Sequence, residues 1–371
     1  TTNHTYSKVV IGSTGISGAD GNVFGGGRGS ETALTAGVVG GNVTLTIDNG
    51  NILGSVYGGG RLASVGTNFV NPYQTDTNGN IVTDAESGEP VPHPDYGKMQ
   101  TGTNHGHVTV NINGGFIGTE TATGVNGNIF GASKGTANNF ELGIVKSTKI
   151  TMTDGTAYAS VYGGGELAQV VESHTTDGKA LGTEIAISGG TIGISGQGGE
   201  TWGNVFAAGK GNTTQVEAGL VKTNTKVTIS ETDATNKPTT IYHNIYGGGA
   251  YGSVGTFTYA DATAPSLPVS CAEGTGTAYI AITGGTIGVN GNENGMVFGS
   301  SRGDVGAPDE IHDYLAWVYD TDVTIDGGQI NGSIYGGGEN GHTFKDAKVT
   351  IHDGIIGISR SAERRVGKEC R

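Results

Sequence analysis

The stretch Ser55–Gly66, SVYGGGRLASVG, places three consecutive glycines behind a Val-Tyr pair, and it decides how the rest of the chain is interpreted. Similar boxes of an aliphatic residue, an aromatic residue and small residues recur along the chain. Their aromatic position alternates strictly between Phe and Tyr: Phe24, Tyr57, Phe130, Tyr162, Phe206, Tyr246, Phe298 and Tyr335. A phosphate-binding glycine loop is used once in a domain, whereas self-similarity of this kind indicates stacked repeats. The triple glycine is therefore interpreted as the corner of a repeating coil.

A second element precedes most of the boxes, and in it apolar and polar residues alternate before a turn that contains glycine. Examples are VTLTIDNG from Val43, VTVNINGG from Val108 and KVTIHDG from Lys348. A period of two predicts a strand with one buried face. Strands that recur with the boxes, without a helical pattern between them, predict an all-β parallel β-helix (β-solenoid) of about nine coils.

Composition supports this fold class and limits the partners. The chain of 371 residues contains 71 Gly, which disfavours long helices, and only 15% charged residues. A formal net charge of −14 argues against nucleic acid or an anionic membrane as the main partner. No run of 18 apolar residues occurs, so no membrane-spanning helix is expected.

The two ends of the chain are interpreted as artificial. The N-terminus has no Met and no signal-peptide core. The tail Arg360–Arg371, which contains AERRVGKECR, resembles the translated read-through of a sequencing adapter. We therefore expect residues 1–359 to be a single fragment of a longer β-solenoid. Outside the tail, Cys271 is the only cysteine, which excludes a disulfide framework.

Stacking of the boxes in register has two further consequences. The eight rings should form one ladder, in which each aromatic pair contributes about 0.5–1.5 kcal/mol beyond its buried area. The positions four residues after each ring, which we call the charge row, are Arg28, Arg61, Lys134, Glu166, Lys210, Ala250, Arg302 and Glu339. We expect ion pairs Lys134–Glu166–Lys210 and Arg302–Glu339 between adjacent coils, each worth about 0–1 kcal/mol. A basic stripe for an anionic ligand is the weaker interpretation, because carboxylates interrupt the row.

Two long insertions, at about residues 67–107 and 256–277, follow Tyr-containing boxes and are expected on one side of the rod. Loops at one edge of a repeat scaffold are where binding is expected. In the first insertion, Asn78-Gly79 predicts a two-residue hairpin turn. Asp76, Asn78 and Asn80 there are rich in oxygen and are the one candidate for a calcium site. A solvated hairpin tip is the preferred interpretation, since the spacing fails the EF-hand pattern, and no other cofactor or metal is expected.

The densest group of acidic and aromatic residues gives the candidate binding surface. Its acidic residues are Asp304, Asp309, Glu310, Asp313, Asp320 and Asp322, and Tyr314, Trp317 and Tyr319 supply rings that could stack on sugars. Trp202 is a separate candidate in an expected turn. An exposed acidic loop is the favoured alternative, because no residue is marked as a nucleophile or base. No catalytic residue is assigned.

The alternation of VYGGG and VFGGG boxes with VTIxGG segments, over about Lys8 to Gly357, resembles the β-strand-repeat surface proteins of gut anaerobes such as Bacteroides and Prevotella relatives. The resemblance carries no functional residue. It implies secretion, display at the cell surface as part of a longer chain, and an adhesive or stalk role.

Three functions therefore stand as hypotheses. The leading one is a structural or adhesive extracellular β-solenoid that binds glycan or a host surface through its inserted loops. The second is a carbohydrate-active β-helix enzyme, a polysaccharide lyase or glycosidase, which would need carboxylates about 5–10 Å apart. The third is a spacer without a ligand. Coils cut at their ends would also expose strand edges, so self-association is expected.

Overall fold

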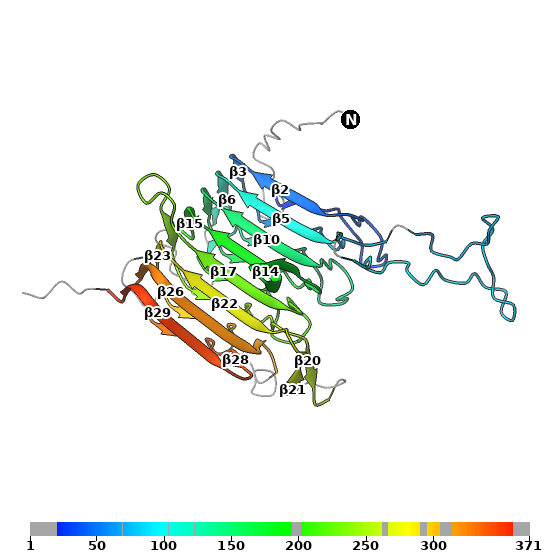
Figure 1. The fold of residues 1–371 in the computed structure, drawn as a ribbon. Helices are drawn as coiled ribbons and strands as arrows, with labels where there is room; N and C mark the ends of the chain where they lie inside the picture. The colour runs from blue at the N-terminus through cyan, green and yellow to red at the C-terminus, as the bar shows by residue number, and fades with distance from the viewer. Residues whose placement is uncertain are drawn as a thin grey trace, which may run out of the picture.

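The structure is a computed structural model that describes residues 21–68, 70–102, 104–121, 124–194, 202–261, 266–289, 295–304 and 314–358. Every regular element in these ranges is a β-strand, and most strands pair in parallel within two long sheets (Figure 1). The all-β, parallel-strand prediction is confirmed.

The first sheet contains one two-residue strand from each glycine box, and we call it the aromatic ladder. Its eight strands follow one another in chain order: β1 (Val23–Phe24), β4 (Val56–Tyr57), β9 (Ile129–Phe130), β12 (Val161–Tyr162), β16 (Val205–Phe206), β19 (Ile245–Tyr246), β24 (Val297–Phe298) and β27 (Ile334–Tyr335). Each ring is paired in register with the ring of the next strand, beginning with Phe24 opposite Tyr57.

The second sheet consists of two parallel ladders. The long ladder is β2 (Val43–Ile47), β5 (His107–Ile112), β10 (Ser147–Met152), β14 (Lys179–Ile187), β17 (Asn224–Ile229), β22 (Thr277–Ile282), β26 (Asp320–Ile330) and β29 (Ala347–Ile356). The short ladder is β3 (Asn51–Ile52), β6 (Phe116–Ile117), β11 (Thr156–Ala157), β15 (Gly190–Ile192), β18 (Thr239–Ile241) and β23 (Thr286–Ile287). The strand β26 is long enough to pair in both ladders and joins them into one sheet.

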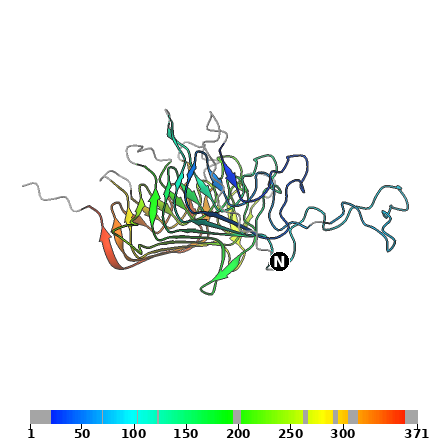
Figure 2. The ribbon, with the colours of Figure 1, turned by 90° about the horizontal axis from the view of Figure 1, so that it is seen from above.

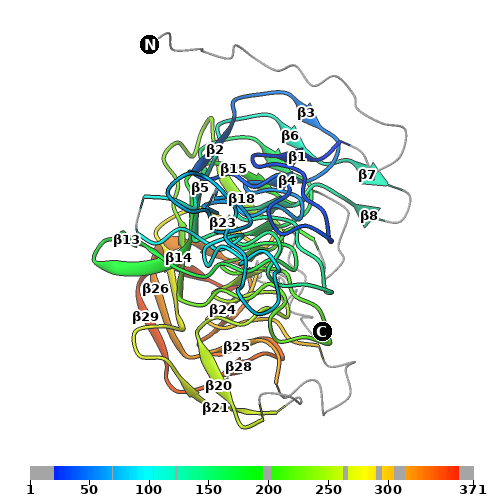
Figure 3. The ribbon, with the colours of Figure 1, turned by 90° about the vertical axis from the view of Figure 1, so that its right-hand side faces the viewer.

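The remaining strands form small pairs at the periphery. They are β7 (Glu120–Thr121) with β8 (Gly124–Val125), β13 (His174–Thr176) with β14, β20 (Phe257–Tyr259) with β21 (Pro268–Cys271), and β25 (Trp317–Val318) with β28 (His342–Thr343). Figure 3 shows β13 and the β20–β21 hairpin leaving the body at different places.

The chain visits the long, short and aromatic ladders in turn and adds one strand to each before it returns (Figure 2). Between an aromatic-ladder strand and the next strand of the long ladder, the returning chain carries a valine in several layers. Parallel bridges join Val170 to Val221 and Val221 to Val254 there. One passage through all the ladders is called a layer below.

The core lies between the ladders and is built from rows of equivalent side chains. Val110, Ile150 and Ile185 occupy one row and are fully buried. A neighbouring row contains threonines whose hydroxyls donate to the carbonyl of the residue after the aromatic ring in the same layer. The four bonds measure 2.5–2.6 Å and join Thr148 to Gly163, Thr183 to Ala207, Thr225 to Gly247 and Thr321 to Gly336. These bonds satisfy polar groups that burial would otherwise penalise.

The predicted ladder of rings is confirmed. Consecutive ring centroids from Phe24 to Tyr335 lie 4.5–5.1 Å apart, and neighbouring ring planes are within 11° of parallel. The inner rings are buried, whereas Tyr335 in the last layer is 46% exposed.

The predicted ion pairs of the charge row are also confirmed. Glu166 lies 2.8 Å from the Lys134 amine and 3.5 Å from that of Lys210, and Arg302 Nε lies 3.7 Å from Glu339. Burial raises the pKa of Glu166, but these two lysines and a hydrogen bond outweigh burial and hold that pKa below its ordinary value. The hydrogen bond comes from the Tyr57 hydroxyl, 2.6 Å away, in a strand two layers before Glu166. Tyr246 donates to Glu339 across the same interval.

Close contact between layers explains why the Tyr-containing boxes hold three glycines. A Cβ added to Gly59 would lie 2.2 Å from Ser133 Oγ of the next layer, and one added to Gly248 would lie 2.0 Å from Ser301 Oγ. The two serine hydroxyls lie in the space that a Cβ would fill. Ser133 accepts a hydrogen bond from the Gly60 N–H and Ser301 accepts one from the Gly249 N–H, both at 3.0 Å. The following Phe-containing layer therefore supplies the side chain that the Tyr-containing layer lacks.

This contact predicts different effects for two equivalent glycines. Gly248→Ala should lower the free energy of unfolding by about 1–3 kcal/mol, because the new methyl overlaps Ser301. Gly337→Ala is the matched control: Gly337 is the second glycine of the last Tyr-containing box, and a Cβ there meets nothing within 4 Å. Chemical denaturation of both variants measures the difference. Equal losses of stability would contradict the close contact.

Candidate functional site

The first insertion leaves the body at Thr67 and returns at His107 (Figure 1). Its base is fixed by Gln100, whose side-chain amide donates to the carbonyls of Gly40 at 2.5 Å and Thr67 at 3.2 Å. Antiparallel bridges such as Tyr73 with Pro92 hold its two arms together. The insertion is therefore anchored to the body and is internally paired.

The hairpin predicted at Asn78-Gly79 is present, but its turn differs from the predicted two-residue form. Asp76 N–H donates to the Asn80 carbonyl at 2.8 Å, which leaves three residues in the loop, with Gly79 at φ +85°. Three-residue loops use a left-handed residue at this place, and the glycine supplies it. The Asp76 carboxylate accepts bonds from the Asn78 and Asn80 N–H groups at 2.8 and 2.9 Å, which favours a turn-capping role for the residue considered as a calcium ligand.

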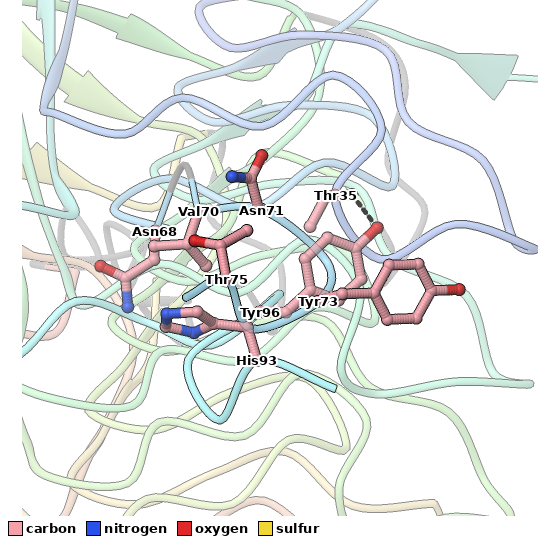
Figure 4. A pocket seen from close by; sticks show the side chains of 8 residues that line it. All are labelled: Thr35, Asn68, Val70, Asn71, Tyr73, Thr75, His93 and Tyr96. Atoms are coloured by element: carbon pink, nitrogen blue, oxygen red, sulfur yellow. Dashed lines mark hydrogen bonds between the residues drawn. The ribbon is translucent and has the colours of Figure 1, made fainter. Parts of the chain in front are cut away.

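A hollow of about 630 Å³ lies between this insertion and the body (Figure 4). Its lining combines aromatic, amide, hydroxyl and imidazole groups: Thr35, Asn68, Val70, Asn71, Tyr73, Thr75, His93 and Tyr96. Its volume falls in the range of small-molecule sites, about 300–1,000 Å³. We call it the insertion hollow.

Tyr96 of the insertion hollow is held in place, and the rings of Tyr73 and Tyr96 both stay accessible. Tyr73 and Tyr96 are each 40% exposed. The Tyr96 hydroxyl lies 3.0 Å from Thr35 Oγ1 of the body (Figure 4). Beside it, a Cβ at Gly97 would contact Leu34 at 3.5 Å, so the two segments pack together. Fixed aromatic faces among hydrogen-bonding groups suit a ligand with both apolar faces and hydroxyls.

A second aromatic surface contains two of the residues predicted from the sequence. Trp317 stacks on His342 with ring centroids 4.5 Å apart, and Tyr319 stacks on Phe344 at 5.7 Å. Phe257 of β20 lies 6.0 Å from Phe344. Sequence reasoning missed these three partners, because the contacts join segments far apart in the chain.

The other predicted binding residues are dispersed. Tyr314 is only 5% exposed and packs with Leu315 and Ala316, so it offers no open face to a sugar. The ring of Trp202 covers Gly124, where a Cβ would lie 2.3 Å from the indole. Asp304 is partly buried, and Asp309 and Glu310 lie outside the described residues.

A serine, two histidines and a glutamate meet where β5, β10 and the β13–β14 hairpin come together. Ser147 Oγ lies 2.7 Å from His107 Nδ1 and 3.0 Å from His174 Nδ1, and His174 Nε2 lies 3.1 Å from Glu184. The order Ser–His–Glu matches a nucleophile, base and orienting acid. However, Ser147 is 1% exposed and sits between the two imidazoles, so a substrate cannot reach it. The cluster instead ties the hairpin to the sheet.

This cluster predicts a loss of stability in acid. The hydrogen bond from His174, helped by Lys149 and Thr176, outweighs burial and lowers the pKa of Glu184 from 4.5 to about 2. A carboxylate with a lowered folded-state pKa stabilises the fold above its unfolded pKa, and this stability is lost as pH falls from about 4.5 through 2.

Glu184→Gln should therefore reduce the acid sensitivity of the melting temperature between pH 5 and pH 2, since Gln does not titrate. Glu89→Gln is the control, because Glu89 is exposed and forms no ion pair among the described residues. Thermal unfolding at intervals of half a pH unit checks this. Parallel pH profiles for the wild type and Glu184→Gln would refute the stabilising role.

Comparisons with family models, curated proteins and solved structures find no match to this chain. Within the ranges that the structure covers, no helix has the length and apolar character needed to cross a membrane. The same residues contain no group of three His, Cys, Asp or Glu arranged to hold a metal ion.

Proposed function

We propose that the ladders are the faces of one β-solenoid of about nine coils, which serves as a structural and adhesive scaffold and binds glycan at the insertion hollow. Two features support the solenoid: each ladder follows chain order, and successive passages of the chain add parallel strands to the same ladders. The coil count continues to rest on the sequence repeat. An extracellular or cell-surface location belongs to the same proposal.

The observation that carries glycan binding is the pair of exposed tyrosines in the insertion hollow, of which Tyr96 is held by Thr35. A sugar ring has an apolar face of C–H groups and a rim of hydroxyls. The rings of Tyr73 and Tyr96 can stack on this apolar face. At the rim, hydrogen bonds can be donated or accepted by Asn71, His93 and Thr75. Because the Tyr96 side chain is already positioned by Thr35, it loses less conformational entropy on binding.

The lining of the insertion hollow favours binding over cleavage. Glycoside hydrolysis generally requires a pair of carboxylates, and the eight described residues that line this hollow include no Asp or Glu. The Ser147–His174–Glu184 cluster is closed to substrate. Adhesion therefore takes precedence over the lyase or glycosidase hypothesis.

A glycan array tests this proposal. Tyr73→Ala with Tyr96→Ala should weaken binding at least tenfold, about 1.4 kcal/mol, because both ring faces are lost. Tyr96→Phe keeps the ring and should retain most of the affinity. Ile81→Ala removes an exposed apolar side chain elsewhere in the insertion and serves as the control. Undiminished binding by the double variant, or release of oligosaccharide by the wild type, would overturn the proposal.

The last described layer exposes side chains whose counterparts in earlier layers are buried. Ile351 and Ile356 in β29 are 50% and 43% exposed, whereas their counterparts in β26, Ile325 and Ile330, are both 0% exposed. An apolar edge strand with free backbone groups is a template for pairing with another chain. We infer that this edge mediates self-association.

Sedimentation velocity at increasing concentration should show oligomers of the 371-residue chain. Ile351→Lys with Ile356→Lys should shift them toward monomer, since charged side chains protect strand edges. Val269→Lys makes a similar change at an exposed site in β21 and should have no effect. A wild-type chain that stays monomeric at high concentration would count against an open edge.

A further inference from the structure

A second hollow is lined in part by the segment 30–36, which also contributes Thr35 to the insertion hollow. It measures about 500 Å³, and Arg28, Ser30, Glu31, Ala36, Arg61 and Leu62 contribute to its lining. Thr35 lines the insertion hollow, and its neighbour Ala36 lines the second one. The two hollows therefore share one short segment of chain.

Arg28 and Arg61 are the first two cations of the charge row, and their environment differs from that of the others. A parallel backbone bridge joins the two residues, so they occupy adjacent layers, about 4.8 Å apart. Lys134 follows in the next layer, but its amine is held 2.8 Å from Glu166. Among the described residues, no carboxylate lies within 4 Å of either guanidinium, although Glu31 lines the same hollow.

This arrangement leaves a local excess of positive charge in a chain whose net charge is −14. Both arginines are exposed. Farther along the charge row, Lys134, Lys210 and Arg302 are each paired with glutamate, whereas this end of the row is not neutralised. Arginine forks bind carboxylate or sulfate through two parallel hydrogen bonds, and two forks in adjacent layers can hold closely spaced anionic groups.

We propose that the glycan bound at the insertion hollow is acidic, and that Arg28 and Arg61 bind its anionic groups while Tyr73 and Tyr96 stack on an adjoining sugar ring. The shared chemistry is an oxyanion carried by a sugar, either a uronic acid carboxylate or a sulfate ester. This inference rests on the proposed glycan binding and specifies its ligand class. Free polyanions such as nucleic acid are disfavoured, because the rest of the strongly acidic chain repels them.

The experiment compares matched charged and neutral ligands by calorimetry on the full chain. One arm uses a galacturonic acid hexasaccharide and its fully methyl-esterified form. The other arm uses a sulfated carrageenan hexasaccharide and its desulfated form. In at least one arm, the charged form should bind the wild type at least tenfold more tightly than its neutral partner, and this preference should decrease as salt is raised.

The variant Arg28→Gln with Arg61→Gln should reduce the affinity for the charged form to that for the neutral one and leave the neutral affinity unchanged. Lys237→Gln with Lys348→Gln removes the same charge at two exposed lysines elsewhere and should preserve the preference. Arg28→Lys with Arg61→Lys keeps the charge but not the fork, and should give an intermediate preference. Circular dichroism confirms folding.

The outcomes separate this inference from the proposed function. Equal binding of charged and neutral forms in both arms overturns the acidic-ligand inference and leaves glycan binding intact. A charge preference that survives Arg28→Gln with Arg61→Gln also overturns it. Binding of no tested or arrayed glycan overturns both. The arm that shows the preference identifies the anion as carboxylate or sulfate.

Discussion

Close contact between successive layers at the glycine corners is the constraint on which the structure depends. In the inner Tyr-containing layers there is no room for a Cβ on the box glycines, because an adjacent layer occupies that space with a backbone atom or a serine hydroxyl. The Phe-containing layers obey a looser rule: Ala207 and Ala208 stand where other boxes have glycine, and both are fully buried. Small side chains are thus confined to alternate layers, where the preceding triple glycine leaves space for them.

The alternation of Phe and Tyr follows from a related limit on buried polar groups. A tyrosine hydroxyl inside the stack needs a partner. Tyr57 and Tyr246 find theirs in Glu166 and Glu339, each two layers away. Phe130 and Phe298 occupy the layers between and add no competing hydroxyl. The rings therefore stack continuously, while each glutamate accepts a hydrogen bond from a tyrosine and also pairs with cations: Glu166 with two lysines and Glu339 with Arg302.

Contacts between residues of the repeat were predictable from the sequence, because equivalent residues occupy equivalent positions in every layer. The ring ladder and the pairs Lys134–Glu166 and Arg302–Glu339 required only correct alignment of the boxes. The link from Tyr57 to Glu166 was missed, since it skips a layer and alignment compares only neighbours. Trp317 and Tyr319 were found as aromatics, but not their partners. Phe257 belongs to an inserted hairpin, whose position against the body no repeat specifies.

The insertion hollow combines a part of the chain whose position follows from the repeat with an inserted segment whose position does not. One wall is the segment 30–36, which the repeat holds beside Arg28, and the other is the hairpin from residues 67–107, anchored through Gln100. A rigid stack can carry such a hairpin because each layer is stabilised by its neighbours rather than by the loop. The loop is then free to carry exposed tyrosines. Because the hairpin is anchored to the body through Gln100, we propose that its aromatic surface keeps a fixed position relative to Arg28 and Arg61, so that the two hollows bind parts of one ligand.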